Sequence, residues 1–239
     1  MKIADKSILI TGASRGIGRA LVDEALRRGA RRVYAGTRGP FSHADARVTA
    51  VKLDVTSAED IQRAAGSIDS LDLLVNNAGI APYDDLSNPE ILERTFAVNL
   101  FGVLNVTRAF LPLLKRSRGS VVNHLSMVAL AALPLIPAYS ISKAAALNLT
   151  QSLRALLAGD GVKVHAVVLG PVDTDMNRGL DIPKATTASA ARGIFDGLER
   201  GEEDIFPDPA SQSVAEGWRN GAAKALERQV AAFVPGNAA

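Results

Sequence analysis

A short apolar run followed by a glycine-rich turn near the start of the chain limits its fold more than any other feature. Residues 7–10 read as a buried strand, residues 11–18 contain three glycines, and an apolar helical pattern follows. In this setting Gly12 permits a tight turn, Gly16 lets a pyrophosphate approach the backbone, and Gly18 lets the helix pack closely. Free N–H groups at the helix N-terminus would face the anion. The segment predicts a nucleotide site, with an ordinary strand-to-helix turn as the alternative.

Strands and helices alternate along the rest of the chain. The further strand-like runs lie at residues 32–37, 47–53, 71–75, 120–125, 161–169 and 203–206. This alternation predicts an α/β fold, a single-domain, Rossmann-like doubly wound parallel sheet of about seven strands with helices on both faces. With 47% apolar residues, 239 residues suffice for one core. We expect a cofactor half (about 1–125), a catalytic and substrate half (about 126–210) and a helical tail (about 211–239).

Tyr139 and Lys143 lie four residues apart in a helix predicted to start near Ala138. This spacing puts both side chains on one helix face. A cation within about 4–6 Å lowers the pKa of a tyrosine from its usual value of about 10, which makes the phenol a usable acid and base. Alone, the pair indicates only a solvated surface helix. Ser126, which ends the strand-like run before it, strengthens the interpretation of a reactive site.

The residues after the second and third strands bear on which nucleotide binds. NAD-binding chains place a carboxylate after the second strand, whereas this chain has Thr37 and Arg38 there, with Arg15 in the glycine turn. An arginine pairs with a 2′-phosphate, so we expect NADP(H) rather than NAD(H). The alternative for Arg38 is a solvated loop residue. Asp54 either accepts a hydrogen bond from the adenine amine or caps the helix that begins near Ser57.

Composition excludes several classes of function. The chain has no cysteine, and His43, His124 and His165 form no ligand-like pair, so we expect no disulfide and no metal site. The 27 basic and 25 acidic residues are scattered, which argues against a nucleic-acid partner. We find no charged leader and no apolar run near 18–20 residues, and therefore expect a cytoplasmic protein without a membrane partner.

With these positions laid out, the chain resembles the short-chain dehydrogenase/reductase family over about residues 7–206. The matches are TGASRGIG at 11–18, NNAG at 76–79, a serine thirteen positions before the tyrosine (139 minus 126), and YSISK at 139–143. Asn99 stands where the family has its fourth catalytic residue. Departures are Leu169 in place of a usual proline, Leu125 in place of a common serine, and His124 at a usually aliphatic position.

The resemblance implies an NADPH-dependent carbonyl reductase with a tetrad of Asn99, Ser126, Tyr139 and Lys143. Tyr139 would donate a proton to the carbonyl oxygen while hydride reaches its carbon, and Ser126 would hydrogen-bond that oxygen. Lys143 would hold the nicotinamide ribose and lower the tyrosine pKa, and Asn99 would anchor a water. Together with the residues argued above, the expected cofactor contacts are Gly12, Ser14, Arg15, Gly16, Ile17, Gly18, Thr37, Arg38, Asp54, Val55, Asn76, Ala78, Gly79, Tyr139, Lys143, Gly170, Val172 and Thr174. The alternative is a non-catalytic NADP(H)-sensing regulatory protein of the same fold.

The substrate side is less sharply defined. Residues 175–191 are rich in small residues and read as a mobile loop and short helix, and apolar neighbours indicate an aldehyde or ketone substrate with apolar substituents. His124 is interpreted as a hydrogen-bonded, partly buried histidine, with a substrate or proton-relay role as the alternative. The tail predicts one amphipathic helix over residues 212–233, packed on its own domain; the alternative places Trp218 at a subunit contact or the substrate entrance. The family also implies a homodimer or homotetramer.

Overall fold

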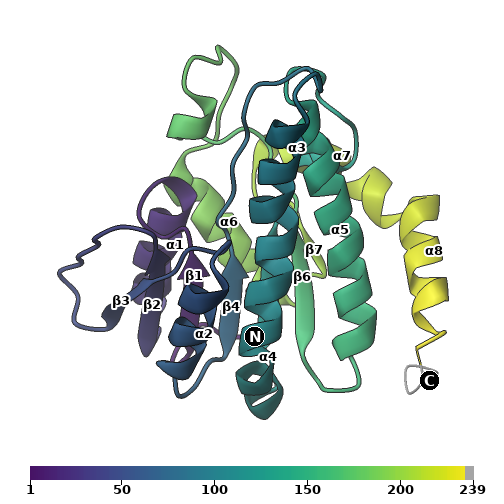
Figure 1. Cartoon of the computed structure of the whole chain (residues 1–239). Coiled ribbons are helices and arrows are strands. Elements are labelled where there is room, and N and C mark those ends of the chain that lie inside the picture. The colour runs from purple at the N-terminus through teal and green to yellow at the C-terminus, as the bar shows by residue number, and fades with distance from the viewer. Residues whose placement is uncertain (235–239) are drawn as a thin grey trace.

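A seven-stranded parallel sheet runs through the computed structural model, which describes residues 1–234 (Figure 1). The strands are β1 Ser7–Thr11, β2 Arg32–Thr37, β3 Val48–Lys52, β4 Leu73–Asn76, β5 Ser120–His124, β6 Lys163–Val167 and β7 Asp204–Ile205. Their order is β3-β2-β1-β4-β5-β6-β7, and every neighbouring pair is parallel. The predicted fold class is confirmed. The order reverses direction between β1 and β4, which is where such sheets bind ligands.

Helices cover both faces of the sheet. They are α1 Gly16–Arg27, α2 Ala58–Gly66, α3 Pro89–Phe96, α4 Val103–Ser117, α5 Pro137–Leu157, α6 Thr187–Arg200, α7 Pro209–Arg219 and α8 Ala222–Ala231. A π-helix at Ala97–Gly102 joins α3 to α4, so the helical run Pro89–Ser117 contains a wider turn. This turn carries Asn99.

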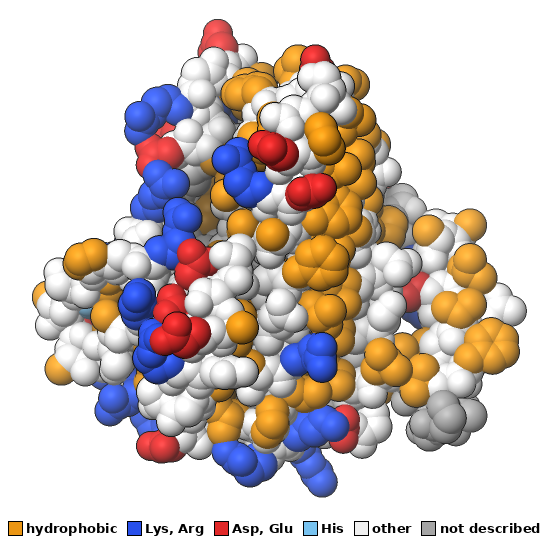
Figure 2. All heavy atoms as spheres, in the orientation of Figure 1, with side chains coloured by type: hydrophobic (Ala, Val, Ile, Leu, Met, Phe, Trp, Pro, Cys, Tyr) orange, Lys and Arg blue, Asp and Glu red, His pale blue; other side chains and the backbone are white. Residues whose placement is uncertain are grey.

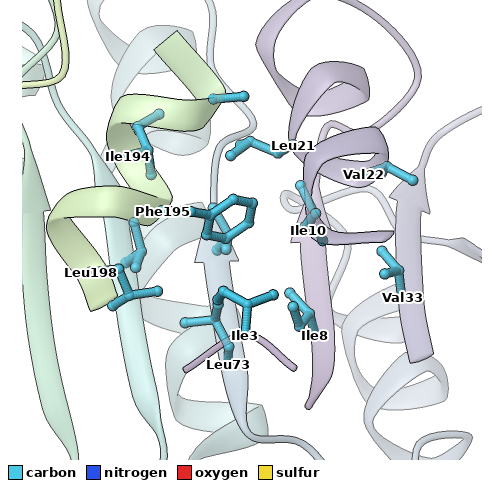
Figure 3. Packing of buried hydrophobic residues seen from close by; sticks show 14 of the residues in the cluster. Ile3, Ile8, Ile10, Leu21, Val22, Val33, Leu73, Ile194, Phe195 and Leu198 are labelled. Atoms are coloured by element: carbon cyan, nitrogen blue, oxygen red, sulfur yellow. The ribbon is translucent and has the colours of Figure 1, made fainter. Parts of the chain in front are cut away.

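Two apolar layers sandwich the strands because alternate side chains point to opposite faces. Figure 3 shows one layer, where Phe195 of α6 and Leu21 of α1 pack on Ile10 of β1. The other layer packs Leu9 and Leu74 of the strands against α2, α4 and α5. The sheet is therefore fixed from both sides, and its carboxyl edge is a rigid base for the loops that follow each strand.

One helix is both long and apolar on average, although Asn99 and Arg108 interrupt it and it contains no uninterrupted apolar run of 18–20 residues. The helical run Pro89–Ser117 has 29 residues and contains a window of mean hydropathy 1.5. By length and composition alone it could cross a membrane. However, 44% of that window is buried, and Val106, Phe110 and Leu114 pack in the core. Packing on the sheet accounts for the apolar character of this helix.

The tail forms two helices and not the single one predicted. The first, α7, begins earlier than expected because Asp208 and Ser211 form a capping box, and the chain breaks at Asn220 and Gly221 before α8. Trp218 donates from Nε1 to Asp204 Oδ2 at 2.8 Å, so the indole is tied to β7 of its own chain. Residues 235–239 of the expected tail lie outside the described part.

Candidate active site

The glycine turn between β1 and α1 forms a cradle that side chains would fill. Gly12 and Gly16 have φ of +65° and +55°, the left-handed region that favours glycine. A Cβ on Gly12 would lie 2.9 Å from the Ala78 Cα, and one on Gly18 would lie 2.2 Å from the Gly12 carbonyl oxygen. The N-cap residue of α1, Arg15, makes no side-chain capping bond, which leaves the first-turn N–H groups to a ligand. The cradle fits a pyrophosphate.

Thr11 and Asn77 bind this turn to the loop after β4. The Thr11 hydroxyl accepts hydrogen bonds from the backbone N–H groups of Asn77 and Ala78, both at 3.0 Å. Asn77 Nδ2 donates to the carbonyl oxygens of Thr11 and Gly12 at 2.8 and 3.2 Å. Neither residue was among the predicted site residues. Both lie within the quoted motifs, so the signal was present but the motifs do not say which members support the others.

Asn76 points into the core and away from the cradle. Its Nδ2 donates to Thr107 Oγ1 at 3.0 Å and to Asn123 Oδ1 at 2.9 Å, and Asn123 donates onward to Thr150 Oγ1 at 3.0 Å. This chain of buried polar side chains joins β4 and β5 to α4 and α5. The Asn76 side chain is therefore structural, and its predicted position along a cofactor would have to depend on its backbone.

The two predicted arginines have different surroundings. Arg38 is exposed and makes no hydrogen bond or ion pair with any residue in 1–234. Arg15 instead pairs with Asp175 of the loop after β6, with Nη1 and Oδ2 3.2 Å apart. Thr37 is buried and donates from its hydroxyl to the Gly39 carbonyl at 2.8 Å. Arg38 is thus free to meet an incoming ligand.

Asp54 follows β3 and does not cap α2. Its Oδ1 accepts from the backbone N–H of Thr56 at 2.9 Å and from its hydroxyl at 2.7 Å. Ser57 is the N-cap, accepting from Asp60 N at 3.2 Å, so the capping alternative for Asp54 is wrong. Val55 is buried, and its Cγ2 would lie 2.9 Å from a Cβ on Gly102 in the π-helix. Its expected contact with a cofactor stays a prediction.

Tyr139 and Lys143 share one face of α5, as their spacing indicates. The Lys143 Nζ lies 5.5 Å from the centroid of the Tyr139 ring and donates to the His124 carbonyl oxygen at 2.6 Å. Ser126 follows β5 as the N-cap of a short 3-10 turn and accepts from Val128 N at 3.4 Å. The sheet edge thus holds an ammonium, a phenol and a hydroxyl close together.

Burial sets the protonation of this pair. It raises the pKa of Tyr139 to about 12, while the hydrogen bond with the Ser126 hydroxyl acts in the opposite sense. Burial also lowers the pKa of Lys143 to about 8. The pKa of Tyr139 is therefore raised and not lowered as expected, because loss of hydration outweighs the hydrogen bond with Ser126. Tyr139 therefore holds its proton at neutral pH.

Asn99 is fully buried in the π-helix, and its amide is used internally. Nδ2 donates to the Ile80 carbonyl at 2.9 Å and to Ser142 Oγ at 3.0 Å, while Oδ1 accepts from Ile80 N at 3.0 Å. Gly79 leaves room beside it, since a Cβ there would lie 3.3 Å from Asn99 Oδ1 and 3.8 Å from Lys143 Nζ. Asn99 thus fastens the loop after β4 to α5.

The segment after β6 closes the site from the other side. Gly170 N donates to Oδ2 of the buried Asp208, the N-cap of α7, at 2.9 Å, a contact that the sequence did not predict. Val172 pairs with Ala185 in a parallel bridge, and residues 173–184 form an excursion with a short 3-10 turn at Asp175–Asn177. A Cβ on Gly16 would lie 3.3 Å from the Thr174 Cγ2, so this segment touches the glycine turn.

A groove of about 640 Å³ opens beside the turn. Its lining includes Arg15, Arg19, Thr174 and Arg192. The groove does not reach Tyr139, so it extends the phosphate cradle and is not the place of the acid–base chemistry. Its lining carries both arginines and carboxylates, including Asp23 and Asp173.

A doubly wound parallel sheet with a phosphate cradle and a tyrosine–lysine pair at one carboxyl edge defines a class of protein, the nucleotide-dependent oxidoreductases of Rossmann-like fold. Comparison with known proteins narrows the class. The model of the short chain dehydrogenase family matches residues 6–184. The chain belongs to this family of oxidoreductases.

Several relatives and solved structures are similar over most of the chain. "Oxidoreductase UcpA" of Salmonella typhimurium is 34% identical over 248 residues, which cover 92% of this chain and 93% of that protein. A short chain dehydrogenase from Burkholderia cenocepacia, solved in complex with NADP, is 38% identical with a TM-score of 0.88, covering 96% of this chain and 98% of that one. A Streptomyces avermitilis short-chain dehydrogenase is 26% identical with a TM-score of 0.81, covering 93% and 96%.

Proposed function

We propose that the protein is an NADP(H)-dependent oxidoreductase that reduces an aldehyde or ketone to an alcohol, reversibly, with Tyr139 as the general acid and base. The observation that carries the proposal is the position of Lys143 Nζ, 5.5 Å from the Tyr139 ring, at the sheet edge that also holds Ser126 and the glycine cradle. A phenol that keeps its proton at neutral pH suits donation to a carbonyl oxygen.

NADP(H) is the cofactor that the residues favour. Arg38 stands after β2 where a carboxylate would repel a 2′-phosphate, and its guanidinium has no partner among the described residues. The Burkholderia cenocepacia relative was solved with NADP, which supports the same choice. The turn at Gly12, Gly16 and Gly18 would hold the pyrophosphate. When bound, the cofactor supplies the hydride.

Ser126, Tyr139 and Lys143 each have a separate role in the proposed proton transfer. Ser126 would hydrogen-bond the substrate oxygen and keep it beside the Tyr139 hydroxyl. Tyr139 donates its proton to that oxygen as negative charge develops there. Lys143, with a pKa of about 8, is mostly protonated at neutral pH, and its charge would stabilise the phenolate that is left. Asn99 acts as a positioning residue because it holds Ile80 and Ser142.

An apolar substrate is favoured by the two segments that are expected to border it. Leu135 precedes α5 and is 58% exposed, and Met176 and Ile182 of the excursion after β6 are 46% and 45% exposed. Exposed apolar side chains in these two segments favour a ligand that covers them. We therefore assign an aldehyde or ketone with apolar substituents as the substrate class.

Replacing Tyr139 by Phe tests the proposal. Removal of the proton donor is expected to lower the rate of NADPH oxidation with a panel of apolar ketones by roughly 10²–10⁴-fold, while NADP⁺ binding persists. Tyr34→Phe on β2, far from the site, is the matched control and should leave the rate unchanged. Unaltered turnover in Tyr139→Phe would contradict the mechanism. Tight NADPH binding without oxidation by any carbonyl would favour the nucleotide-sensing alternative.

We further propose that the protein forms a homodimer through α4 and α5. Hydrophobic side chains gather over these helices in Figure 2, and Phe101 of the π-helix before α4 and Ile141 of α5 are 52% and 41% exposed. Ala144 is also exposed on α5 and small enough for close helix approach. Sedimentation of the wild type and of Ile141→Glu tests this surface. A dimer that the glutamate separates is the expected result, and a wild-type monomer would contradict it.

A further inference from the structure

His124, the last residue of β5, is buried without a partner for its ring. The residue is 6% exposed, and its Nε2 is closed to solvent with no hydrogen bond. Nδ1 also makes no hydrogen bond within residues 1–234. The sequence-based expectation of a hydrogen-bonded histidine is therefore wrong. Because a buried polar group without a partner is costly, a histidine at this position indicates a partner that binds from outside the chain.

The ring belongs to the face of the sheet that meets the cradle. Alternation along β5 puts the His124 side chain on the same face as Val122, which packs in one cluster with Ala13 of the glycine turn and Val172 of the segment after β6. The backbone of His124 meanwhile accepts the hydrogen bond from Lys143. His124 thus stands between the reactive pair and two segments expected to hold the cofactor.

The protonation of His124 decides what it can offer. Burial, followed by the positive charge of Lys143, lowers the pKa of His124 to about 3, so the ring is neutral and carries one N–H. Nε2 is closed to solvent and has no hydrogen-bond partner. Nδ1 also has no partner, but it is not closed to solvent. A buried N–H without an acceptor is rarer and costs more free energy than a buried acceptor without a donor. The proton is therefore favoured on Nδ1.

We propose that His124 is a cofactor-binding residue whose Nδ1–H donates a hydrogen bond to the nicotinamide half of NADP(H). The inference depends on the proposed function, since hydride transfer requires the nicotinamide beside Tyr139 and Lys143. That half offers carboxamide, ribose and phosphate oxygens as acceptors. The adenosine half, expected near Arg38 at the far side of β1, is out of reach of His124.

Calorimetric titration with two ligands tests the inference. NADP⁺ contains both halves, whereas adenosine 2′,5′-bisphosphate lacks the nicotinamide half. His124→Leu is expected to weaken NADP⁺ binding about tenfold and to leave binding of the bisphosphate unchanged. His124→Asn, which places an amide N–H near the position of Nδ1, should restore most of the affinity, and His124→Gln should restore less.

The outcomes separate this inference from the proposed function. Wild type that does not bind NADP⁺ would overturn both. Normal NADP⁺ binding by His124→Leu, or equal losses for both ligands, would overturn only the inference. NMR of histidine-labelled wild type gives a readout that needs no variant. NADP⁺ should shift the ring nitrogen signals of His124. The signals of His165, the other buried histidine with an unpartnered Nε2, should stay unchanged. If NADP⁺ left the His124 signals unchanged as well, the inference would be overturned.

Discussion

At the scale of single residues, the reactive pair depends on two groups that burial moves in opposite directions. Tyr139 is made a weaker acid, and Lys143 a weaker base, by the same loss of hydration. At neutral pH both therefore keep their protons. In the proposed mechanism this state suits reduction, in which the phenol would give up a proton, while the reverse reaction would need a phenolate and is expected to gain from higher pH.

Arg38 is the residue at which cofactor choice is expected to change. An aspartate there would repel the 2′-phosphate and accept hydrogen bonds from an unmodified ribose. Arg38→Asp should weaken NADPH binding by at least about tenfold and move the preference in kcat/KM towards NADH. Arg32→Asp, also exposed and at the opposite end of β2, is the control. An unchanged preference in Arg38→Asp would mean that the 2′-phosphate is recognised elsewhere, with Arg15 as the next residue to test.

The sequence predicted which residues gather at the site better than it predicted what each one does. Spacing placed Tyr139 and Lys143 on one helix face, because helical geometry depends only on local chain. It failed on the tyrosine pKa, because burial depends on everything packed around α5. The supporting residues Thr11 and Asp208 were missed for the same reason. Their roles come from contacts between segments far apart in the sequence.

At the scale of elements, a buried ion cluster holds α8 to the rest of the chain. Lys224 is 2% exposed, and its Nζ lies 2.8 Å from Asp204, 3.0 Å from Glu203 and 3.0 Å from Glu227. Arg154 of α5 pairs with two of the same carboxylates. Sequence periodicity found the apolar face of the tail but gave no sign of this polar attachment.

Lys224→Met is expected to destabilise the protein. It leaves Asp204 and Glu227 buried with less compensating charge, a change that costs about 3–5 kcal/mol in other buried pairs. Urea unfolding measures the difference, and proteolysis should cut first near α8. Lys163→Met, which removes an exposed lysine at the start of β6, is the control and should alter the free energy of unfolding by less than about 0.5 kcal/mol. A similarly small change in Lys224→Met would show that the cluster adds little.

At the scale of the whole molecule, the parallel sheet was predictable because each strand is buried on both faces and carries a continuous apolar run. The ends of the strands were less predictable. The apolar run at residues 161–169 extends past both ends of β6, which pairs with its neighbours only over Lys163–Val167. The π-helix was not predicted, because nothing in a continuous helical pattern separates α3 from α4. The polar residues within the strands also have consequences for the stability of the entire fold.

His165 on β6 is expected to make the protein less stable in acid. Burial lowers its pKa to about 4, below the value of about 6.5 expected in the unfolded chain. Between these values the unfolded chain binds more protons, so the free energy of unfolding falls as pH falls. The loss from pH 7 to pH 5 is roughly 2 kcal/mol for this residue.

His165→Asn removes the titrating group and retains an amide that can donate to the Glu202 carbonyl, the present partner of Nδ1 at 2.6 Å. Urea unfolding at pH 7 and pH 5 should show a smaller difference for the variant than for the wild type. Equal differences would mean that other groups control the acid response. His124 retains its own contribution in both proteins.

The bridge between Val172 and Ala185 has a consequence for how this enzyme could diversify. The two ends of residues 173–184 are held together by the hydrogen bonds of Asp173 and Ala185. Thr174 and Asp175 contact the glycine turn and Arg15, so they belong to the fixed part of this segment. Residues 176–184 are outside these contacts, and we expect their length and composition to vary among related proteins without disturbing the sheet edge. Under the proposed function, substrate range is then expected to change through these nine positions (184 minus 175).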